Sequence, residues 1–289
     1  MTGLVMEGGA MRGMFTAGVC DVLMEHNIAF DGAIGVSAGA TFGCNYKSRQ
    51  IGRVIRYNKR FAHEWRYCSL RSLFLTGNLF GTDFCYNAIP NRLDLFDYKT
   101  YRANPMKFYV VVSDCQTGEP VYKELPLCDE IELTWMRASA SMPLVSTPVT
   151  IDGKRFLDGG MTDSIPLAKF QEMGYTKNVV ILTQPKEFVK KSSELMGLMK
   201  INLRRYPKLL AKMGNRHIEY NRQHDYVFEQ EKAGKAIVLC PEKPLGISRT
   251  EHNPDELQRC YDTGRQVAES RLKEIIEFIA DGQKAVLPD

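Results

Sequence analysis

Short apolar runs alternate with amphipathic stretches along the first part of the chain. The run Leu4-Val5-Met6 leads into Glu7-Gly8-Gly9, which predicts a buried strand followed by a tight turn. Apolar side chains then recur at helical spacing over residues 13–26. Strand character returns over 28–36, and small residues over 38–45 indicate a second helix. This order of elements is typical of a parallel sheet covered by helices.

The same patterns continue to the end of the chain. Buried or hairpin strands are predicted at 107–113, 120–123, 149–156, 179–182 and 237–239, and helices at 51–61 and 165–173. Residues 63–91 are ambiguous. After Pro185 the pattern becomes helical and basic over 186–216, interrupted at Pro207, and a long amphipathic helix is predicted from Glu256 to Ile279. We expect a three-layer α/β/α domain with a mainly parallel sheet and a helical C-terminal part.

Composition narrows the class of protein. With 289 residues, 44% hydrophobic and 25% charged, the chain is globular, and it has no run of eighteen apolar residues that could span a membrane. Residues 1–9 lack the features of a secretory signal, so a cytoplasmic location is expected. The eight cysteines form no C-x-x-C pair, which argues against a disulfide framework or structural zinc. A net charge of +4 is too small to indicate a nucleic-acid partner.

The motif Gly35-Val36-Ser37-Ala38-Gly39 matches G-x-S-x-G between a predicted strand and a predicted helix. A serine at the apex of such a turn has a strained backbone, and its neighbours must be small for the turn to close. Its hydroxyl projects into solvent while the helix N-terminus provides positive potential for an anion. Ser37 is therefore a candidate nucleophile; the alternative is a small-residue turn with a capping serine.

Residues 7–13, Glu-Gly-Gly-Ala-Met-Arg-Gly, form a second glycine-rich turn. Such a turn can point successive N–H groups at one anion, either a nucleotide phosphate or the oxyanion of an acyl-transfer intermediate. A dinucleotide fingerprint requires glycine where Ala10 stands and an acid near the end of the second strand, whereas Asp31 lies at that strand's beginning. A P-loop lysine followed by Ser or Thr is absent. The oxyanion interpretation is favoured over the phosphate one, with a purely structural turn as the further alternative.

A third motif, Asp158-Gly159-Gly160, closes the strand that begins at Lys154, and it offers a base for an activated serine. Histidine is the other candidate base, because Ser37, Asp158 and His252 follow the chain order of an α/β-hydrolase triad. That fold places several strands before the nucleophile, however, and only two precede Ser37. The other four histidines, at 26, 63, 217 and 224, have no catalytic context in the sequence.

Taken together, the three motifs resemble those of the patatin-like phospholipase family. The oxyanion loop corresponds to Gly8–Gly13 with its basic residue Arg12, the elbow to Gly35–Gly39, and the aspartate motif to Asp158–Gly160. Residues 138–143, Ala-Ser-Ala-Ser-Met-Pro, are similar to the family's small-residue stretch before the aspartate strand. The resemblance covers residues 3–184, so we expect a patatin-like catalytic core over 1–184 and a helical part over 185–289 packed on the same core.

The resemblance implies a lipid acyl hydrolase that uses a Ser–Asp dyad and needs no histidine, metal or cofactor. Ser37 would attack the acyl carbon and Asp158 would accept its proton, while Gly8, Gly9, Ala10, Met11, Arg12 and Gly13 would form the oxyanion hole. Since aspartate is a weak base at its ordinary pKa, Asp158 should lie in a partly desolvated niche. Ala10 stands where the family often has glycine, which is tolerable if this residue needs no positive φ.

Residues 186–216 carry nine Lys or Arg against two acids, with leucines and methionines between them. This composition fits a helix pair lying on an anionic membrane, or a solvated helix whose leucines pack on the core. The expected partner is a lipid or acyl-ester substrate. Two alternatives remain: a non-catalytic module that binds an anionic lipid or nucleotide, and a histidine-dependent esterase. The acyl chain, the headgroup and the oligomeric state are not predicted.

Overall fold

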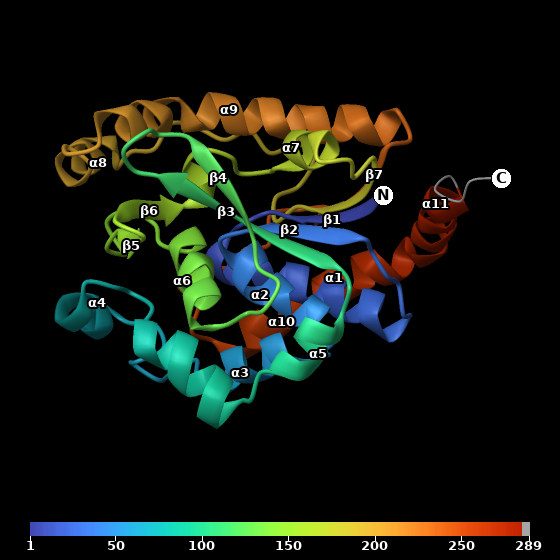
Figure 1. The fold of residues 1–289 in the computed structure, drawn as a ribbon, viewed down its shortest axis with the longest axis horizontal. Helices are drawn as coiled ribbons and strands as arrows, with labels where there is room; N and C mark the ends of the chain where they lie inside the picture. The colour runs from blue at the N-terminus through green and yellow to red at the C-terminus, as the bar shows by residue number, and fades with distance from the viewer. Residues whose placement is uncertain (285–289) are drawn as a thin grey trace.

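A single sheet lies at the centre of the molecule, with helices on both faces (Figure 1). This computed structural model describes residues 1–284. The strand order is β5-β6-β3-β2-β1-β7-β8, with β4 also paired to β3. Strands β3, β2, β1, β7 and β8 are parallel, while β4, β5 and β6 pair antiparallel, which confirms the mainly parallel α/β architecture. The strands are β1 Thr2–Met6, β2 Gly32–Val36, β3 Lys107–Asp114, β4 Pro120–Glu124, β5 Val149–Ile151, β6 Lys154–Asp158, β7 Lys177–Ile181 and β8 Ala236–Leu239.

The helices between these strands cover the sheet or extend from its edges. They are α1 Gly13–Glu25, α2 Ala38–Lys47, α3 Arg53–Arg60, α4 Leu70–Thr76, α5 Tyr98–Ala103, α6 Glu130–Ser139, α7 Leu167–Glu172, α8 Met196–Asn202, α9 Pro207–Lys232, α10 Pro254–Ser270 and α11 Leu272–Lys284. Short 3₁₀ turns occupy Ala10–Arg12 and Gly159–Met161, and Phe84–Leu93 is a π-helix. Within residues 1–284, no helix is both long and apolar enough to cross a bilayer.

Alternating side chains of the buried strands build two cores. On β1, Leu4 and Met6 join the core beneath α1, α2 and α10, while Val5 joins the core beneath α7 and α9. This is the period-two pattern of a strand covered on both faces. Helices α1 and α10 pack closely because Gly18 and Gly264 carry no side chain and each faces backbone of the other helix. The C-terminal helix α10 is thereby held against the first helix of the chain.

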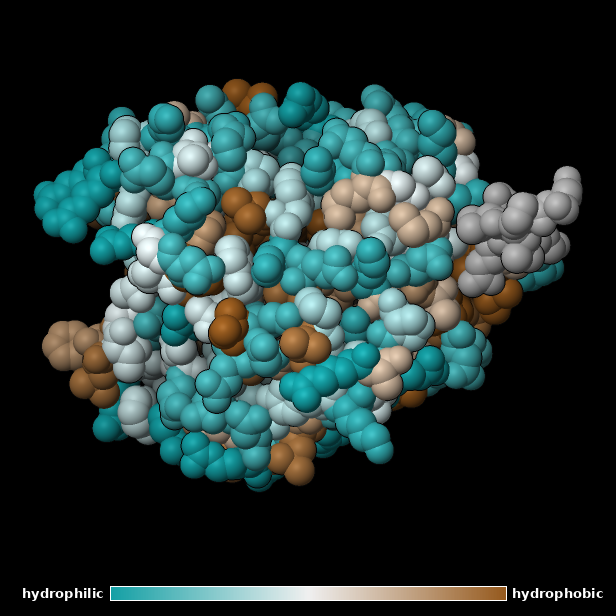
Figure 2. All heavy atoms as spheres, in the orientation of Figure 1, coloured by the Kyte–Doolittle hydropathy of each residue, from teal (hydrophilic) through white to brown (hydrophobic). Residues whose placement is uncertain are grey.

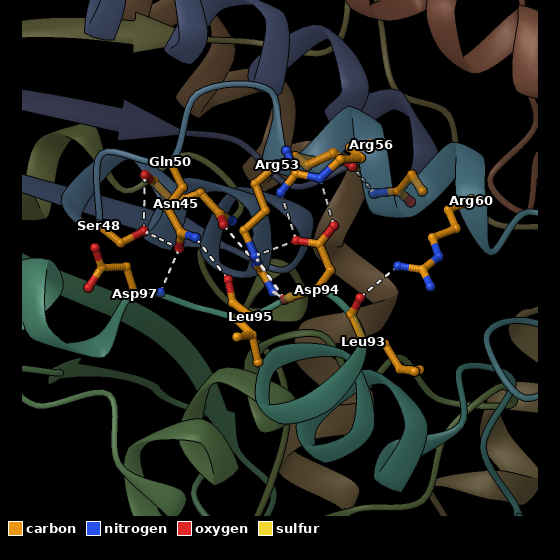
Figure 3. A network of polar contacts seen from close by, with 12 residues as sticks. Asn45, Ser48, Gln50, Arg53, Arg56, Arg60, Leu93, Asp94, Leu95 and Asp97 are labelled. Atoms are coloured by element: carbon orange, nitrogen blue, oxygen red, sulfur yellow. Dashed lines mark hydrogen bonds and ion pairs between the residues drawn. The ribbon is translucent and has the colours of Figure 1, made fainter.

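A polar network ties α3 to the segment that follows the π-helix (Figure 3). Asp94 is buried; Arg56 donates to both of its carboxylate oxygens at 2.8 Å, and Nε of Arg53 lies 3.2 Å from Oδ1. Arg53 also donates to the Asp94 carbonyl, and to Asn45 Oδ1 at 2.9 Å. This network connects α3 to Asp94 and so holds the two sides of residues 63–91, the region that the sequence left ambiguous.

The prediction of a basic helical stretch over 186–216, interrupted at Pro207, is wrong for its first part. Residues 186–195 are irregular, and helix begins only at α8 and again at Pro207, the first residue of α9. The physical reason lies in Asn221 of α9. Its side chain accepts from the Lys190 N–H at 2.8 Å and donates to the Lys190 carbonyl at 3.0 Å. The N–H and the carbonyl of Lys190 thus have hydrogen-bond partners outside a helix, and the segment is held to α9 at this point.

The predicted helix over 256–279 is two helices, α10 and α11, separated at Arg271. The Arg271 guanidinium donates to the Val238 carbonyl and pairs with Glu231 at 2.8 Å, which fixes this residue to the end of β8 and to α9. Two other boundaries also differ: the second strand begins at Gly32 instead of residue 28, and α7 is shorter than the predicted 165–173. The hairpin turn at Asp152-Gly153 is confirmed, with both residues at positive φ.

Candidate active site

The pairing along β3 brings Ser37 and Asp158 together. Strand β2 pairs with β3 as far as Val36 opposite Val111, and β6 continues along the same edge of β3 with Asp158 opposite Val112. Strand β4 occupies the other edge of β3. Asp158 therefore lies directly beyond the end of β2, where Ser37 leaves the sheet. The two residues are distant in sequence but occupy consecutive positions along one edge.

Ser37 forms a strained turn between β2 and α2, with φ 55° and ψ −119°. Positive φ is rare for a residue with a side chain, and backbone strain of this kind clusters at active sites. The turn is held by Ser139, whose hydroxyl accepts from the Ser37 N–H at 3.0 Å. A Cβ on Gly8 would lie 2.8 Å from Cβ of Ser37, so only glycine lets the loop approach the serine this closely. Val36 ends β2, and Ala38 and Gly39 begin α2.

Asp158 ends β6 in a buried niche, with 1% of its surface exposed. Burial raises its pKa to about 6, although the Ser37 hydroxyl and the Gly160 N–H act as hydrogen-bond donors that lower it. The expectation of a desolvated aspartate is thus confirmed. The Gly160 N–H donates to Oδ1 at 2.8 Å, whereas Oδ2 has no well-aligned hydrogen bond within the described residues. Oδ2 is the carboxylate oxygen that remains available for a proton.

The loop after β1 presents free amides beside this pair. The N–H groups of Gly8, Gly9 and Ala10 donate to no acceptor within residues 1–284. Met11 and Arg12 complete the 3₁₀ turn, and Gly13 begins α1. Alanine replaces glycine at position 10 without strain only if this residue needs no positive φ. Ala10 has φ 49°, so this condition is not met. The alanine adopts the left-handed conformation that glycine would adopt without strain.

Glu7 fixes the base of this loop, a role that the sequence did not indicate. Its carboxylate is buried and accepts from the Thr183 N–H at 2.6 Å and from the Tyr220 hydroxyl at 2.7 Å. Thr183 in turn donates to the Gly8 carbonyl at 3.1 Å. The loop is therefore attached both to the residues after β7 and to α9.

A cavity of about 340 Å³ opens from Ser37 between α2, α3, the π-helix and α6. Its walls are mostly apolar, and Ala10, Met11, Ser37, Leu195, Met199 and Arg249 lie among its lining residues. A cavity of this size and character suits a small apolar ligand or an acyl chain. The serine lies where such a ligand would meet the loop amides.

The histidines lie away from the pair. His252 places Nδ1 2.8 Å from the Ala62 carbonyl, next to the end of α3, and no histidine is among the groups that shift the pKa of Asp158. His224 is buried in α9, stacked on Tyr220 and in edge-on contact with Phe228, and burial lowers its pKa. The chain order Ser37, Asp158, His252 therefore does not correspond to an assembled triad.

Sequence reasoning also missed three cations of the C-terminal part that lie near the site. Nε of Arg216 donates to the Gly160 carbonyl, and the Arg249 carbonyl lies 3.5 Å from the Met11 N–H. Nζ of Lys190 lies 4.0 Å from the centre of the Tyr220 ring. For Lys190 and Arg216 the available signal was the basic composition of residues 186–216. That composition indicated a membrane-facing or solvent-exposed surface and not a place beside the active site.

Comparison with known proteins gives two family matches. A model described as patatin-like phospholipase matches residues 4–170, and one described as a domain of unknown function (DUF6363) matches residues 206–280. The chain is 30% identical over 188 residues to uncharacterized protein YjjU of Escherichia coli K12, covering 64% of this chain and 52% of that protein. It is 26% identical over 181 residues to lysophospholipase NTE1 of Meyerozyma guilliermondii, covering 60% of this chain and 12% of that protein.

Among solved structures, VipD from Legionella pneumophila aligns with a TM-score of 0.43 and 13% identity, covering 93% of this chain and 67% of that one. The chain spans about half the length of YjjU and about an eighth of the length of the lysophospholipase. The patatin-like model covers more than half of the chain and includes the loop, the elbow and the aspartate motif. The chain belongs to the patatin-like phospholipase family.

Proposed function

We propose that this protein is a serine hydrolase that cleaves carboxylic ester bonds of lipids with a Ser37–Asp158 dyad. The observation that carries the proposal is the meeting of a strained serine with a buried aspartate whose pKa is raised to about 6. A carboxylate with such a pKa is deprotonated near neutral pH and still a useful base. The free amides of the 8–10 loop support an oxyanion hole, and the apolar cavity supports an acyl group as the part that is bound.

The proposed reaction has two halves. Ser37 Oγ attacks the acyl carbon as its proton moves to Oδ2 of Asp158, and the amides of Gly8, Gly9 and Ala10 stabilise the oxyanion. The leaving alcohol takes the proton from Asp158, which leaves an acyl-serine. Water then attacks the acyl carbon, again giving its proton to Asp158, and the fatty acid is released as Ser37 regains a proton.

The lipid character of the substrate is supported by the family and by relatives named lysophospholipases. Because the chain spans only a fraction of those relatives, their activity is a proposal here. Three further features are also proposals. They are peripheral membrane contact through residues 186–216, a cytoplasmic location, and the division into a catalytic core at 1–184 and a helical part at 185–289.

Hydrolysis of short and long acyl esters, measured together with labelling by a fluorophosphonate probe, tests the dyad. Ser37→Ala and Asp158→Asn should each lose hydrolysis and labelling together, by about 1,000-fold or more. His252→Gln is the control and should retain both. Wild-type turnover should rise with pH through about 6, as the Asp158 carboxyl loses its proton. Near-normal turnover by Asp158→Asn would refute the dyad, and loss of turnover in His252→Gln alone would favour a triad.

A further inference from the structure

Four cationic side chains from distant parts of the sequence lie around the aspartate motif and the oxyanion loop. A guanidinium nitrogen of Arg216 lies 3.2 Å, and Oδ1 of Asp158 3.1 Å, from the position that a Cβ on Gly160 would take. Nε of Arg12 lies 3.3 Å from the corresponding position on Gly9. Arg249 lines the cavity itself, and Lys190 lies on the irregular segment that Asn221 of α9 holds. The cations therefore flank both the aspartate and the oxyanion loop.

These charges have no carboxylate partners. Within residues 1–284, none of the four lies within 4 Å of a carboxylate oxygen in an ion pair. Glu7, the nearest acid besides Asp158, is already bound to Thr183 and Tyr220. Nε of Arg12 is buried and has no hydrogen-bond acceptor in the described part of the chain. Arg12, Lys190 and Arg216 are half-buried, and Arg249 is exposed. Partly buried cations without counter-ions are unfavourable, so this site is suited to an anion supplied by a ligand.

The cations also repel one another. Burial, followed by the positive charges of Arg216, Arg12 and Arg249, lowers the pKa of Lys190 to about 7, against the opposite effect of Glu7. Burial lowers the pKa of Arg216 as well, while Asp158 and Glu7 oppose the shift. An anion placed between these groups would relieve the repulsion and accept charge-assisted hydrogen bonds from several of them.

We propose that Arg12, Lys190, Arg216 and Arg249 form a subsite for a phosphate monoester, so that the preferred substrate is an acyl ester whose headgroup is a phosphate dianion. The inference rests on the proposed function, because it assumes an acyl chain in the cavity and an ester at Ser37. When Lys190 is protonated, the four cations and the two carboxylates of Glu7 and Asp158 leave two net positive charges, which match one phosphate dianion. A choline headgroup would instead place a positive charge among these cations.

Three of the four cations lie outside residues 4–170, the part matched by the patatin-like model. The headgroup preference would therefore be a property of the second half of this chain. Arg216 also holds the Gly160 carbonyl, so its substitution would disturb the aspartate motif. Lys190 and Arg249 are the better positions for a test, because their side chains hold no other part of the structure by hydrogen bonds within the described residues.

The test compares kcat/KM for soluble octanoyl esters of glycerol, glycerol phosphate and glycerophosphocholine. We expect the phosphate monoester to be preferred over both others by about tenfold or more. Lys190→Met and Arg249→Gln should each reduce this preference by about tenfold, mainly through KM. Lys191→Met, which changes an exposed neighbouring lysine, is the matched control. Equal rates on the three esters, or the same preference in Lys190→Met and Lys191→Met, would overturn the subsite and leave the hydrolase intact.

Calorimetry on the Ser37→Ala protein separates the subsite from the chemistry. Octanoylglycerol phosphate should bind more tightly than inorganic phosphate and octanoylglycerol, and Lys190→Met should weaken its binding about tenfold. Such binding without hydrolysis of any ester by the wild-type protein would support the subsite and refute the proposed function. Inorganic phosphate that binds as tightly as octanoylglycerol phosphate would overturn the headgroup assignment, since the anion would then be held independently of the acyl cavity.

Discussion

Asp158 is buried without a cationic partner in contact, which lowers stability but favours its use as a base. Because its pKa rises from 3.8 to about 6 on folding, its protonated form is stabilised in the folded state. The wild-type protein should therefore lose about 2–3 kcal/mol of stability as the pH rises from below 4 to above 6. Asp158→Asn removes this loss and should be the more stable protein at pH 8, with the difference vanishing near pH 4.

Thermal or urea unfolding at a series of pH values measures this difference. Asp97→Asn provides a contrast, because Asp97 is an exposed helix cap whose pKa is lowered by hydrogen bonds from Thr100. That substitution should destabilise the protein at neutral pH. An Asp158→Asn protein that is less stable than wild type at pH 8 would contradict the expected sign.

Ala10 is a second strained residue beside the serine, with φ 49°. The left-handed conformation costs an alanine about 1–2 kcal/mol, while glycine has an entropic cost of about 0.5–1 kcal/mol on folding. Ala10→Gly should therefore raise the free energy of unfolding by up to about 1 kcal/mol. Ala211→Gly, an exposed position inside α9, should lower it by about 1 kcal/mol. Urea denaturation of the two variants compares the signs, and equal destabilisation would exclude strain at Ala10.

At the scale of elements, the carboxylate of Asp94 holds α3 to the wall of the cavity. Arg53 is nearly buried, with 5% of its side chain exposed, whereas Arg56 is 56% exposed. Asp94→Asn leaves the buried guanidinium without its counter-ion and should cost about 3 kcal/mol of stability. Arg56→Ala removes only an exposed partner and should cost about 1 kcal/mol or less. Urea denaturation should separate the two variants, and equal losses would show that the pairing with Arg53 has no special weight.

Helices and strands were largely predictable where apolar side chains recur at the spacing of one element type over several residues. The strands at 107–113 and 149–156 and the helix after Gly13 are of this kind, because each is specified by local burial. The segment at 186–195 was wrongly predicted since its conformation depends on the Asn221 side chain, which is distant in sequence. The break at Arg271 likewise depends on Val238 and Glu231. Local pattern gives no signal for contacts of this kind.

The same distinction applies to the candidate site. Ser37, Asp158 and the 8–13 loop could be found because glycines and small residues around them form short local motifs. Their meeting depends on the pairing of β2 and β6 along one edge of β3, which the motifs do not state. Lys190, Arg216 and Arg249 carry no motif, because each comes from a different segment and only the tertiary fold brings them together.

At the scale of the whole molecule, α4 and the region around α8 present surfaces of different character. Leu70, Phe74 and Leu75 of α4 are 78%, 90% and 59% exposed. Figure 2 shows hydrophobic atoms at the position of α4 in Figure 1 and hydrophilic atoms at that of α8. Around α8, Met199 and Leu203 pack on the core, whereas Leu198 and Ile201 remain exposed. The core-packing interpretation of the basic segment therefore describes Met199 and Leu203, while membrane contact through its exposed residues stays a prediction.

The exposed apolar residues of α4 and the exposed basic residues around α8 would together suit contact with an anionic membrane. An exposed phenylalanine that enters lipid contributes about 2 kcal/mol, and each lysine near the surface about 1 kcal/mol. Phe74→Ser and Lys200→Gln should each weaken binding to anionic vesicles about five- to thirtyfold, and only the loss from Lys200→Gln should disappear in high salt. Ile276→Ser, on α11 at the far end of the molecule, is the control and should bind as wild type does. Co-sedimentation with neutral and anionic vesicles provides the measurement. Equal binding of all three variants would place the membrane contact elsewhere or exclude it.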